Sequence, residues 1–195
     1  MHDHGRPTPE RLGAFSDGVF AVIITIMVLE LKPPPQPSFA PLPLWPTAVS
    51  YAVSYLFIAI VWVNHHHLLR FAGHATPRLI WWNFAHLVAV SLVPVSTAWV
   101  AVTRFAATPV AVYAAVFVMV NSAYVAFVWE VLAQAEVQKK VSPPMQQVTR
   151  VRSVVTLGIF AIAMVISVKF PLWGFGLVLC VLLAYLRPEH SAEHS

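Results

Sequence analysis

The sequence predicts an all-α membrane protein whose chain crosses the bilayer six times, and three observations support this class. Of the 195 residues, 58% are hydrophobic and only 10% are charged, whereas soluble domains average about 25% charged residues. The apolar residues gather in runs long enough to cross a hydrocarbon core of about 30 Å. The few charged residues lie mostly outside these runs. A water-soluble globule is therefore excluded, and a disulfide scaffold is excluded because Cys180 is the only cysteine.

Six apolar runs are candidates for spanning helices. They cover residues 11–31, 47–69, 79–102, 110–131, 151–168 and 172–186. The sixth run is at the low end of spanning length. It follows the turn Lys169–Phe170–Pro171 almost directly, so the last two runs predict a tight helical hairpin. Residues 11–187 then form one membrane domain between two polar tails, residues 1–10 and 188–195.

The segment between the first two runs is rich in proline. Residues 32–46 contain seven prolines. Because proline has no amide hydrogen to donate, a helix is not expected there. We expect an extended, polyproline-like loop.

The basic residues indicate how the chain is oriented. With six spans both termini lie on one side of the membrane, and that side carries nine of the twelve lysines and arginines. The other side carries Lys32, Arg104 and Lys169. The positive-inside rule therefore predicts a multi-pass protein of the cell membrane with both termini cytoplasmic and residues 32–46 outside. The net charge of +4 is attributed to loops beside anionic lipid, and no nucleic-acid partner is expected.

Polar residues occur inside three of the runs at similar depth. Ionisable groups in a span usually face protein or water rather than lipid. One buried polar network joining three helices is the simplest explanation. Its expected members are Arg11, Ser16 and Asp17 in the first run, Asn64, His65, His66 and His67 in the second, and Asn83 and His86 in the third.

Three consecutive histidines suggest a metal site, but their spacing opposes one. Adjacent helical residues point about 100° apart, and a helical metal pair needs i,i+3 or i,i+4 spacing. We therefore expect no metal and no cofactor, and favour a histidine hydrogen-bonded to Asp17 or Ser16. Catalytic motifs are absent from the sequence, so an enzyme is not predicted. The alternative is a proton-coupled carrier or membrane enzyme that uses Asp17 and the histidines as a relay.

The first run has two different faces. With Val22 placed at 0° on a helical wheel, Gly18, Thr25, Ile26 and Leu29 fall within about 60° of it, whereas Asp17 falls at about −140°. One face is therefore aliphatic with a single hydroxyl. Periodicity alone leaves two interpretations of this stripe open: contact with lipid or a neighbouring helix, or the wall of a pore.

The start of the first run carries a recognisable motif. Residues 11–21 read RLGAFSDGVFA, which resembles the motif of the transmembrane protein 175 family, potassium channels of endosomes, lysosomes and bacterial membranes. The core of the motif is Phe15–Ser16–Asp17, with Arg11 six residues before the aspartate. Further matches are the histidines that end the second run, Asn83 in the third run, and Pro94, Ser96 and Thr97 further along that third run.

The resemblance implies a fold and a function. A chain with six spans is similar to the bacterial single-repeat form, a homotetrameric potassium channel whose four first helices surround a central pore. That family lacks the Thr-Val-Gly-Tyr-Gly filter. By position the constriction, a hydrophobic gate, would fall on Val22, with Thr25, Ile26 and Leu29 further outward. Val22 stands where isoleucine or leucine is common, so a wider constriction is implied.

The resemblance also implies roles for the other residues of the motif. Phe15, Arg11, Ser16, Asp17 and the histidines of the second run would hold helices together and would not touch the ion. A ring of aliphatic side chains can gate by dewetting, and threonine hydroxyls could replace part of the hydration shell of an ion. Neither distinguishes potassium strongly from sodium, so passive potassium conduction with modest selectivity is expected.

The orientation is testable by cysteine labelling. We expect a cysteine at Ser38 to react with a membrane-impermeant thiol reagent added outside intact cells, and a cysteine at Ser142 to stay unlabelled. The reverse pattern would overturn the assignment of both termini to the cytoplasm.

Overall fold

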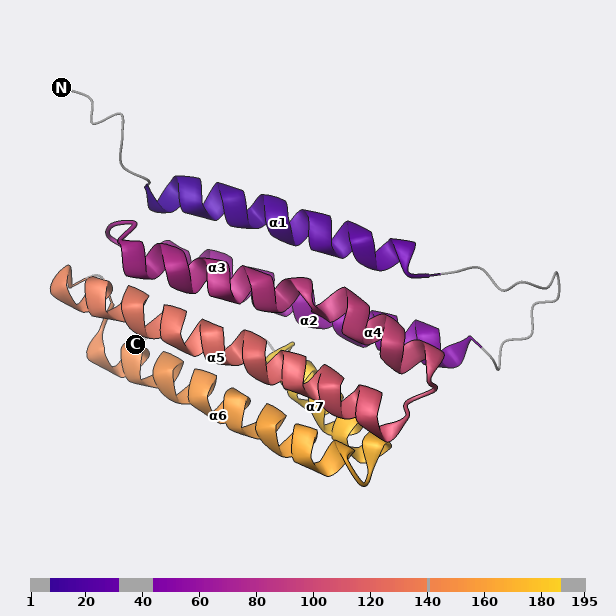
Figure 1. Ribbon diagram of the computed structural model, residues 1–195. Helices are drawn as coiled ribbons and strands as arrows, with labels where there is room; N and C mark the ends of the chain where they lie inside the picture. Colours follow the sequence, from indigo (N-terminus) through magenta and orange to yellow (C-terminus); the bar gives the residue numbers. More distant parts are fainter. Residues whose placement is uncertain (1–7, 32–43, 140, 187–195) are drawn as a thin grey trace.

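The computed structural model describes residues 8–31, 44–139 and 141–186, and this part of the chain is an up-and-down helical bundle (Figure 1). Its seven helical segments are α1 (Pro9–Leu29), α2 (Trp45–Leu69), α3 (Pro77–Ser91), α4 (Val93–Val102), α5 (Ala107–Val137), α6 (Pro143–Ser167) and α7 (Pro171–Tyr185). Helices α3 and α4 follow one another in a single pass, so the chain makes six passes (Figure 1). The all-α membrane fold predicted from the sequence is therefore confirmed.

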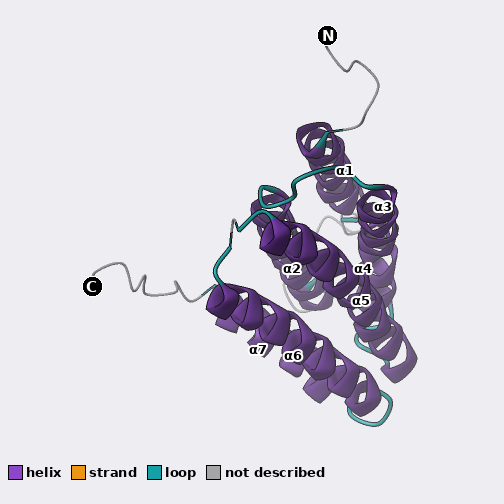
Figure 2. Ribbon diagram, turned by 90° about the vertical axis from the view of Figure 1, so that its left-hand side faces the viewer, coloured by secondary structure: helices purple, strands orange, loops and turns teal. Residues whose placement is uncertain are grey.

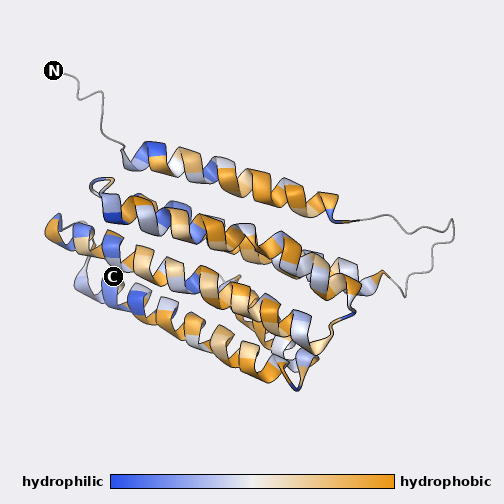
Figure 3. Ribbon diagram, viewed as in Figure 1, coloured by the Kyte–Doolittle hydropathy of each residue, from blue (hydrophilic) through white to orange (hydrophobic). Residues whose placement is uncertain are grey.

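One end of the bundle is polar and basic. Helix α1 begins there and α7 finishes there, beside the α2–α3 and α5–α6 turns (Figure 1). Hydrophilic residues gather toward this end, whereas apolar residues predominate along the rest of the helices (Figure 3). We call it the basic end; the described basic residues there are Arg11, Arg70, Arg78, Lys139, Arg150 and Arg152.

The predicted spans agree with the helices except at their ends. Five passes are long and apolar enough to cross a membrane, and α7, with 15 residues, is shorter. Helices α5 and α6 extend beyond the predicted apolar runs because their polar turns at the basic end continue the helix. The sequence prediction was wrong for Pro46, which lies in the first turn of α2. Proline is tolerated there because that amide has no intrahelical acceptor. Residues 32–43 of the expected loop lie outside the described residues.

The third pass is broken, although a continuous helix over 79–102 was expected. Helix α3 ends at Ser91 and α4 begins at Val93, with Leu92 between them. Pro94 explains the break, because its nitrogen cannot donate to the carbonyl of Val90 and its ring crowds that carbonyl. The chain turns instead through a hydrogen bond from the Leu92 N–H to the Ala89 carbonyl (3.2 Å).

Helix α5 is the central element of the bundle. It packs against α2, α3, α4, α6 and α7. The rings of Phe57 in α2 and Phe117 in α5 stack with centroids 3.6 Å apart, and Phe160 of α6 meets Phe117 edge-on at 5.5 Å. Helix α1 lies at the opposite edge of the bundle from α6 and α7 (Figure 2). The aromatic core therefore forms without α1 at its centre.

The α4–α5 turn uses a left-handed backbone without glycine. Arg104 and Phe105 have φ values of 49° and 61°, a region that non-glycine residues seldom adopt. The Phe105 ring is buried, stacks on Trp45 with centroids 5.2 Å apart and meets Phe175 edge-on at 4.8 Å. These aromatic contacts offset the strain and join α2, α5 and α7 at the end of the bundle opposite the basic end.

The α6–α7 hairpin depends on a glycine. A Cβ atom on Gly174 would collide with Ser167 Oγ and lie 2.7 Å from the Ala163 carbonyl oxygen. A backbone oxygen cannot swing aside, so we expect Gly174→Ala to destabilise the fold by about 1–3 kcal/mol. Gly176→Ala is the matched control, since nothing lies within 4 Å of a Cβ at that position. Thermal unfolding in detergent measures both; an equal loss of stability would contradict the proposed close packing.

Candidate functional site

Helix α1 has a buried face and an uncovered face. Its N-terminus is capped by Thr8, whose Oγ1 accepts from the Arg11 N–H at 3.4 Å. The face toward the rest of the chain is buried and comprises Leu12, Ser16, Phe20, Ile23 and Met27. A spacing of three and four residues keeps these side chains on one side of the helix. No described residue of the other helices buries the opposite side of α1, where the side chains are exposed.

The predicted pore residues lie on the uncovered face. Val22 is 56% exposed and Leu29 is 77% exposed, and Thr25 and Ile26 are also exposed. A Cβ on Gly18 would meet nothing within 4 Å. The Thr25 hydroxyl donates to the Val22 carbonyl at 2.8 Å. Its hydrogen is therefore used within the helix, and its oxygen lone pairs are left for a group outside.

Three of the predicted network residues form a hydrogen-bonded chain. Ser16 Oγ donates to the Leu12 carbonyl (2.8 Å) and accepts from Asn83 Nδ2 (3.0 Å). Asn83 Oδ1 lies 2.7 Å from His65 Nε2. Since that oxygen can only accept, His65 carries its proton on Nε2. All three side chains are fully buried, so α1, α3 and α2 are joined through one amide.

His86 lies beside this chain and bonds elsewhere. Its ring stacks on His65 with centroids 5.7 Å apart, and its Nδ1 lies 3.1 Å from the Val120 carbonyl of α5. His65 Nδ1 and His86 Nε2 have no hydrogen-bond partner among the described residues. Within the same part of the chain, no three His, Cys, Asp or Glu side chains gather as a metal site would require.

Asp17 is separate from the buried chain. Trp62 Nε1 donates to Asp17 Oδ1 at 2.8 Å, and His66 Nδ1 lies 3.6 Å from Oδ2. The side chains of Asp17 and His66 are 38% and 45% exposed. The expected partner of Asp17 was a histidine, and the structure selects His66 together with an unexpected tryptophan. Both partners belong to α2, so the carboxylate joins two helices rather than three.

The remaining predicted residues belong neither to the buried chain of Ser16, Asn83 and His65 nor to the contacts of Asp17. Phe15 meets Phe84 of α3 edge-on at 5.6 Å. Arg11 is exposed, and its backbone N–H takes part in the cap of α1. Asn64 and His67 line a cavity on the other side of α2. The nine residues expected in one network, together with Phe15, therefore divide among several places in the described structure.

Sequence reasoning missed a second hydrogen-bonded group inside the bundle. Ser54 Oγ lies 2.8 Å from the Tyr113 hydroxyl and accepts from Thr97 Oγ1 at 2.7 Å. These residues join α2, α5 and α4. A tyrosine within the apolar run 110–131 was the available signal, because a buried phenol needs a hydrogen-bond partner.

A polar clasp at the basic end was also missed. Gln134 Oε1 of α5 accepts from the backbone N–H groups of Gly73 and His74, each at 3.1 Å. Glu130, one helical turn earlier, accepts from Thr76 Oγ1 at 3.0 Å and lies 3.5 Å from Arg78 Nε. The clasp fixes the α2–α3 turn to α5. The i,i+4 spacing of Glu130 and Gln134 was its only trace in the sequence.

Comparisons with known proteins agree with one another. The family model described as the endosomal/lysosomal potassium channel TMEM175 matches residues 11–94. A potassium channel of Chryseobacterium sp. (strain P1-3) is 33% identical over 189 residues, which are 96% of this chain and 97% of that one. A potassium channel of Streptomyces collinus is 34% identical over 152 residues, 73% and 74% of the two chains.

A solved structure extends the similarity to the fold. The crystal structure of a lysosomal potassium-selective channel TMEM175 homolog from Chamaesiphon minutus superposes with a TM-score of 0.80 at 25% identity. The match covers 91% of this chain and 95% of that chain. The arrangement of the helices is therefore shared along almost the whole length.

The buried amide should matter for stability. Asn83→Leu keeps a similar volume but leaves the His65 N–H without an acceptor and removes a donor to Ser16. We expect the free energy of unfolding in detergent to fall by about 1–3 kcal/mol. Asn64→Leu is the control, since the Asn64 amide makes no hydrogen bond within the described residues. If the two variants lose stability equally, the hydrogen bonds of the Asn83 amide do not stabilise the contact between α1, α2 and α3.

Proposed function

This chain belongs to the family of the endosomal/lysosomal potassium channel TMEM175, and from that membership we propose that it is a potassium-permeable ion channel. Its named relatives are potassium channels and not enzymes. The observation that carries the proposal is the uncovered stripe on α1, where Val22, Thr25, Ile26 and Leu29 face away from the rest of the chain.

The pore is formed between subunits. The interior of one bundle is filled by aromatic rings at Phe57, Phe117 and Phe160, whereas α1 lies at its edge (Figure 2). Four copies with α1 at a common axis would cover the uncovered stripes and enclose a path between them. We therefore infer a homotetramer in the bilayer, with the first helix of each subunit lining a central pore. Closed rotational symmetry is the usual arrangement of such assemblies.

The pore narrows at an aliphatic ring. At 1.5 Å rise per residue, rings of Val22, Ile26 and Leu29 stack about 6 Å and about 4.5 Å apart. A narrow apolar neck is unfavourable for water, so the Val22 ring acts as a hydrophobic gate. The Thr25 oxygens, whose hydrogens are held by the Val22 carbonyls, face ions above the neck. No Thr-Val-Gly-Tyr-Gly filter is present, so selectivity for potassium over sodium is modest.

The orientation follows from charge. The basic end faces the cytoplasm of the cell with both termini, and the segment between α1 and α2 lies outside. The channel domain is residues 11–187. A carrier that uses Asp17 and the histidines as a relay has less support. Asp17 contacts Trp62 and the half-exposed His66, whereas the buried His65 bonds to Asn83 and not to Asp17.

Ion flux in liposomes tests the proposal. We expect purified protein to pass potassium down its own gradient without any proton gradient or organic substrate, and sodium more slowly. Flux that appears only with a proton gradient would establish a coupled carrier instead. Absence of flux in correctly assembled protein would contradict the channel.

The gate is tested at Val22 with Val28 as its matched control. Val22→Ser should wet the neck and raise potassium conductance with weaker discrimination against sodium, and Val22→Phe should reduce the current. Val28 is a valine of similar exposure, 51% against 56%, but lies about 120° away around the helix, so Val28→Ser should leave conductance unchanged. If Val28→Ser alters conduction and Val22→Ser does not, the pore face is elsewhere on α1.

A further inference from the structure

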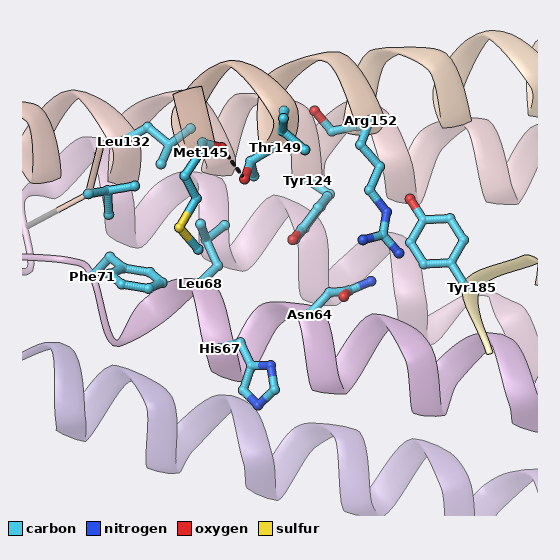
Figure 4. A pocket seen from close by; sticks show the side chains of 13 residues that line it. Asn64, His67, Leu68, Phe71, Tyr124, Leu132, Met145, Thr149, Arg152 and Tyr185 are labelled. Carbon is cyan, nitrogen blue, oxygen red and sulfur yellow. Dashed lines mark hydrogen bonds between the residues drawn. The ribbon is translucent and has the colours of Figure 1, made fainter. Parts of the chain in front are cut away.

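A cavity of about 250 Å³ opens between α2, α5, α6 and α7 at the basic end. It does not touch α1 and lies away from the stripe proposed to line the pore. Figure 4 shows that its wall has two halves. One half is apolar, with Leu68, Phe71, Leu132 and Met145, and the other half presents polar groups.

The polar half is organised around a guanidinium group. Arg152 descends from α6 between Tyr124 and Tyr185, with its guanidinium toward Asn64 (Figure 4). The Arg152 Cζ atom lies 4.2 Å from the centre of the Tyr185 ring. The Tyr185 hydroxyl is in turn 2.7 Å from Thr156 Oγ1. The arginine is thus positioned against a ring that is itself fixed.

Two further polar groups face the cavity. The Asn64 amide and the Tyr124 hydroxyl both line it and make no hydrogen bond within the described residues. An amide N–H and a phenol O–H can each donate to an oxygen of a bound anion. A planar guanidinium presents several N–H groups and recognises phosphate through two parallel hydrogen bonds. The polar half therefore suits an oxyanion.

We propose that this cavity binds an anionic phospholipid, with the lipid phosphate against Arg152, Asn64 and Tyr124. The first part of an acyl chain would lie along Leu68, Phe71, Leu132 and Met145. A free phosphate ion would leave this apolar wall in contact with water, so a headgroup attached to a hydrocarbon chain fits both halves. The basic end supplies the long-range attraction for an anionic lipid, since six of the described lysines and arginines lie there.

Native mass spectrometry of the full chain tests the proposal. Protein in detergent is titrated with dioleoyl phosphatidylglycerol, with dioleoyl phosphatidylcholine, and with the former in the presence of inorganic phosphate. We expect phosphatidylglycerol to bind about tenfold more tightly than phosphatidylcholine, and millimolar phosphate not to displace it. Equal binding of the two lipids overturns the headgroup assignment, and displacement by phosphate indicates a free-anion site instead.

Matched variants distinguish lipid binding in the cavity from attraction to the net charge of the surface. Arg152→Gln should weaken phosphatidylglycerol binding about tenfold, to the level of phosphatidylcholine. Arg70→Gln removes the same charge from an exposed position at the end of α2 that does not line the cavity, and should change binding less than twofold. An equal effect of both variants would show that only the net charge of the basic end matters.

A second pair of variants tests the cavity by volume. Thr149 lines the cavity, so Thr149→Trp should fill it and abolish the bound lipid peak. Val155 lies on the exposed side of α6, outside the cavity, so Val155→Trp should leave binding unchanged. Unaltered melting temperatures identify variants that still fold. Retained lipid in folded Thr149→Trp would contradict the site, whatever the outcome of the ion-flux measurements.

Discussion

The rotation of α1 about its own axis depends on the Asn83 side chain. In a bilayer, aliphatic packing alone gives little preference for one helix rotation, because lipid tails are as apolar as leucine. The amide of Asn83 removes this freedom, since it bonds to Ser16 of α1 and lies within hydrogen-bond distance of His65 in α2. Turning α1 by one residue, about 100°, would separate Ser16 from Asn83. The same contact thereby determines which side of α1 stays uncovered.

Polar contacts between the other helices follow the same logic. Tyr113, Ser54 and Thr97 join three helices in the half of the bundle away from the basic end, and Thr156 with Tyr185 joins the hairpin of α6 and α7. A hydrogen bond between membrane helices contributes only about 0.6 kcal/mol on average. An unpaired polar group in hydrocarbon costs considerably more. These contacts consequently specify which helices are neighbours more than they raise the total stability.

The sequence was sufficient to predict features that belong to a single helix. Hydropathy located the six passes, and the helical wheel placed Val22, Thr25, Ile26 and Leu29 on one side of α1, because both are periodic properties of a single segment. Contacts between segments were harder to derive. Nothing in the sequence pairs Asp17 with Trp62, since the indole is also a common membrane-facing group. Pro94 was visible, but proline is often tolerated in membrane helices, so a break at Leu92 did not follow from it.

The unequal lengths of the helices have a consequence for the surrounding lipid. At 1.5 Å per residue, the 15 residues of α7 extend about 22 Å, whereas the 31 residues of α5 extend about 46 Å. Leu172, Trp173 and Leu183 of α7 are exposed, so this short helix meets lipid directly. A bilayer core of about 30 Å is thicker than α7 is long. Either the bilayer thins beside α7, or the α6–α7 hairpin is displaced toward one surface of the membrane. The bilayer is therefore deformed unevenly around the molecule. In a thicker membrane the deformation energy would rise first beside α6 and α7.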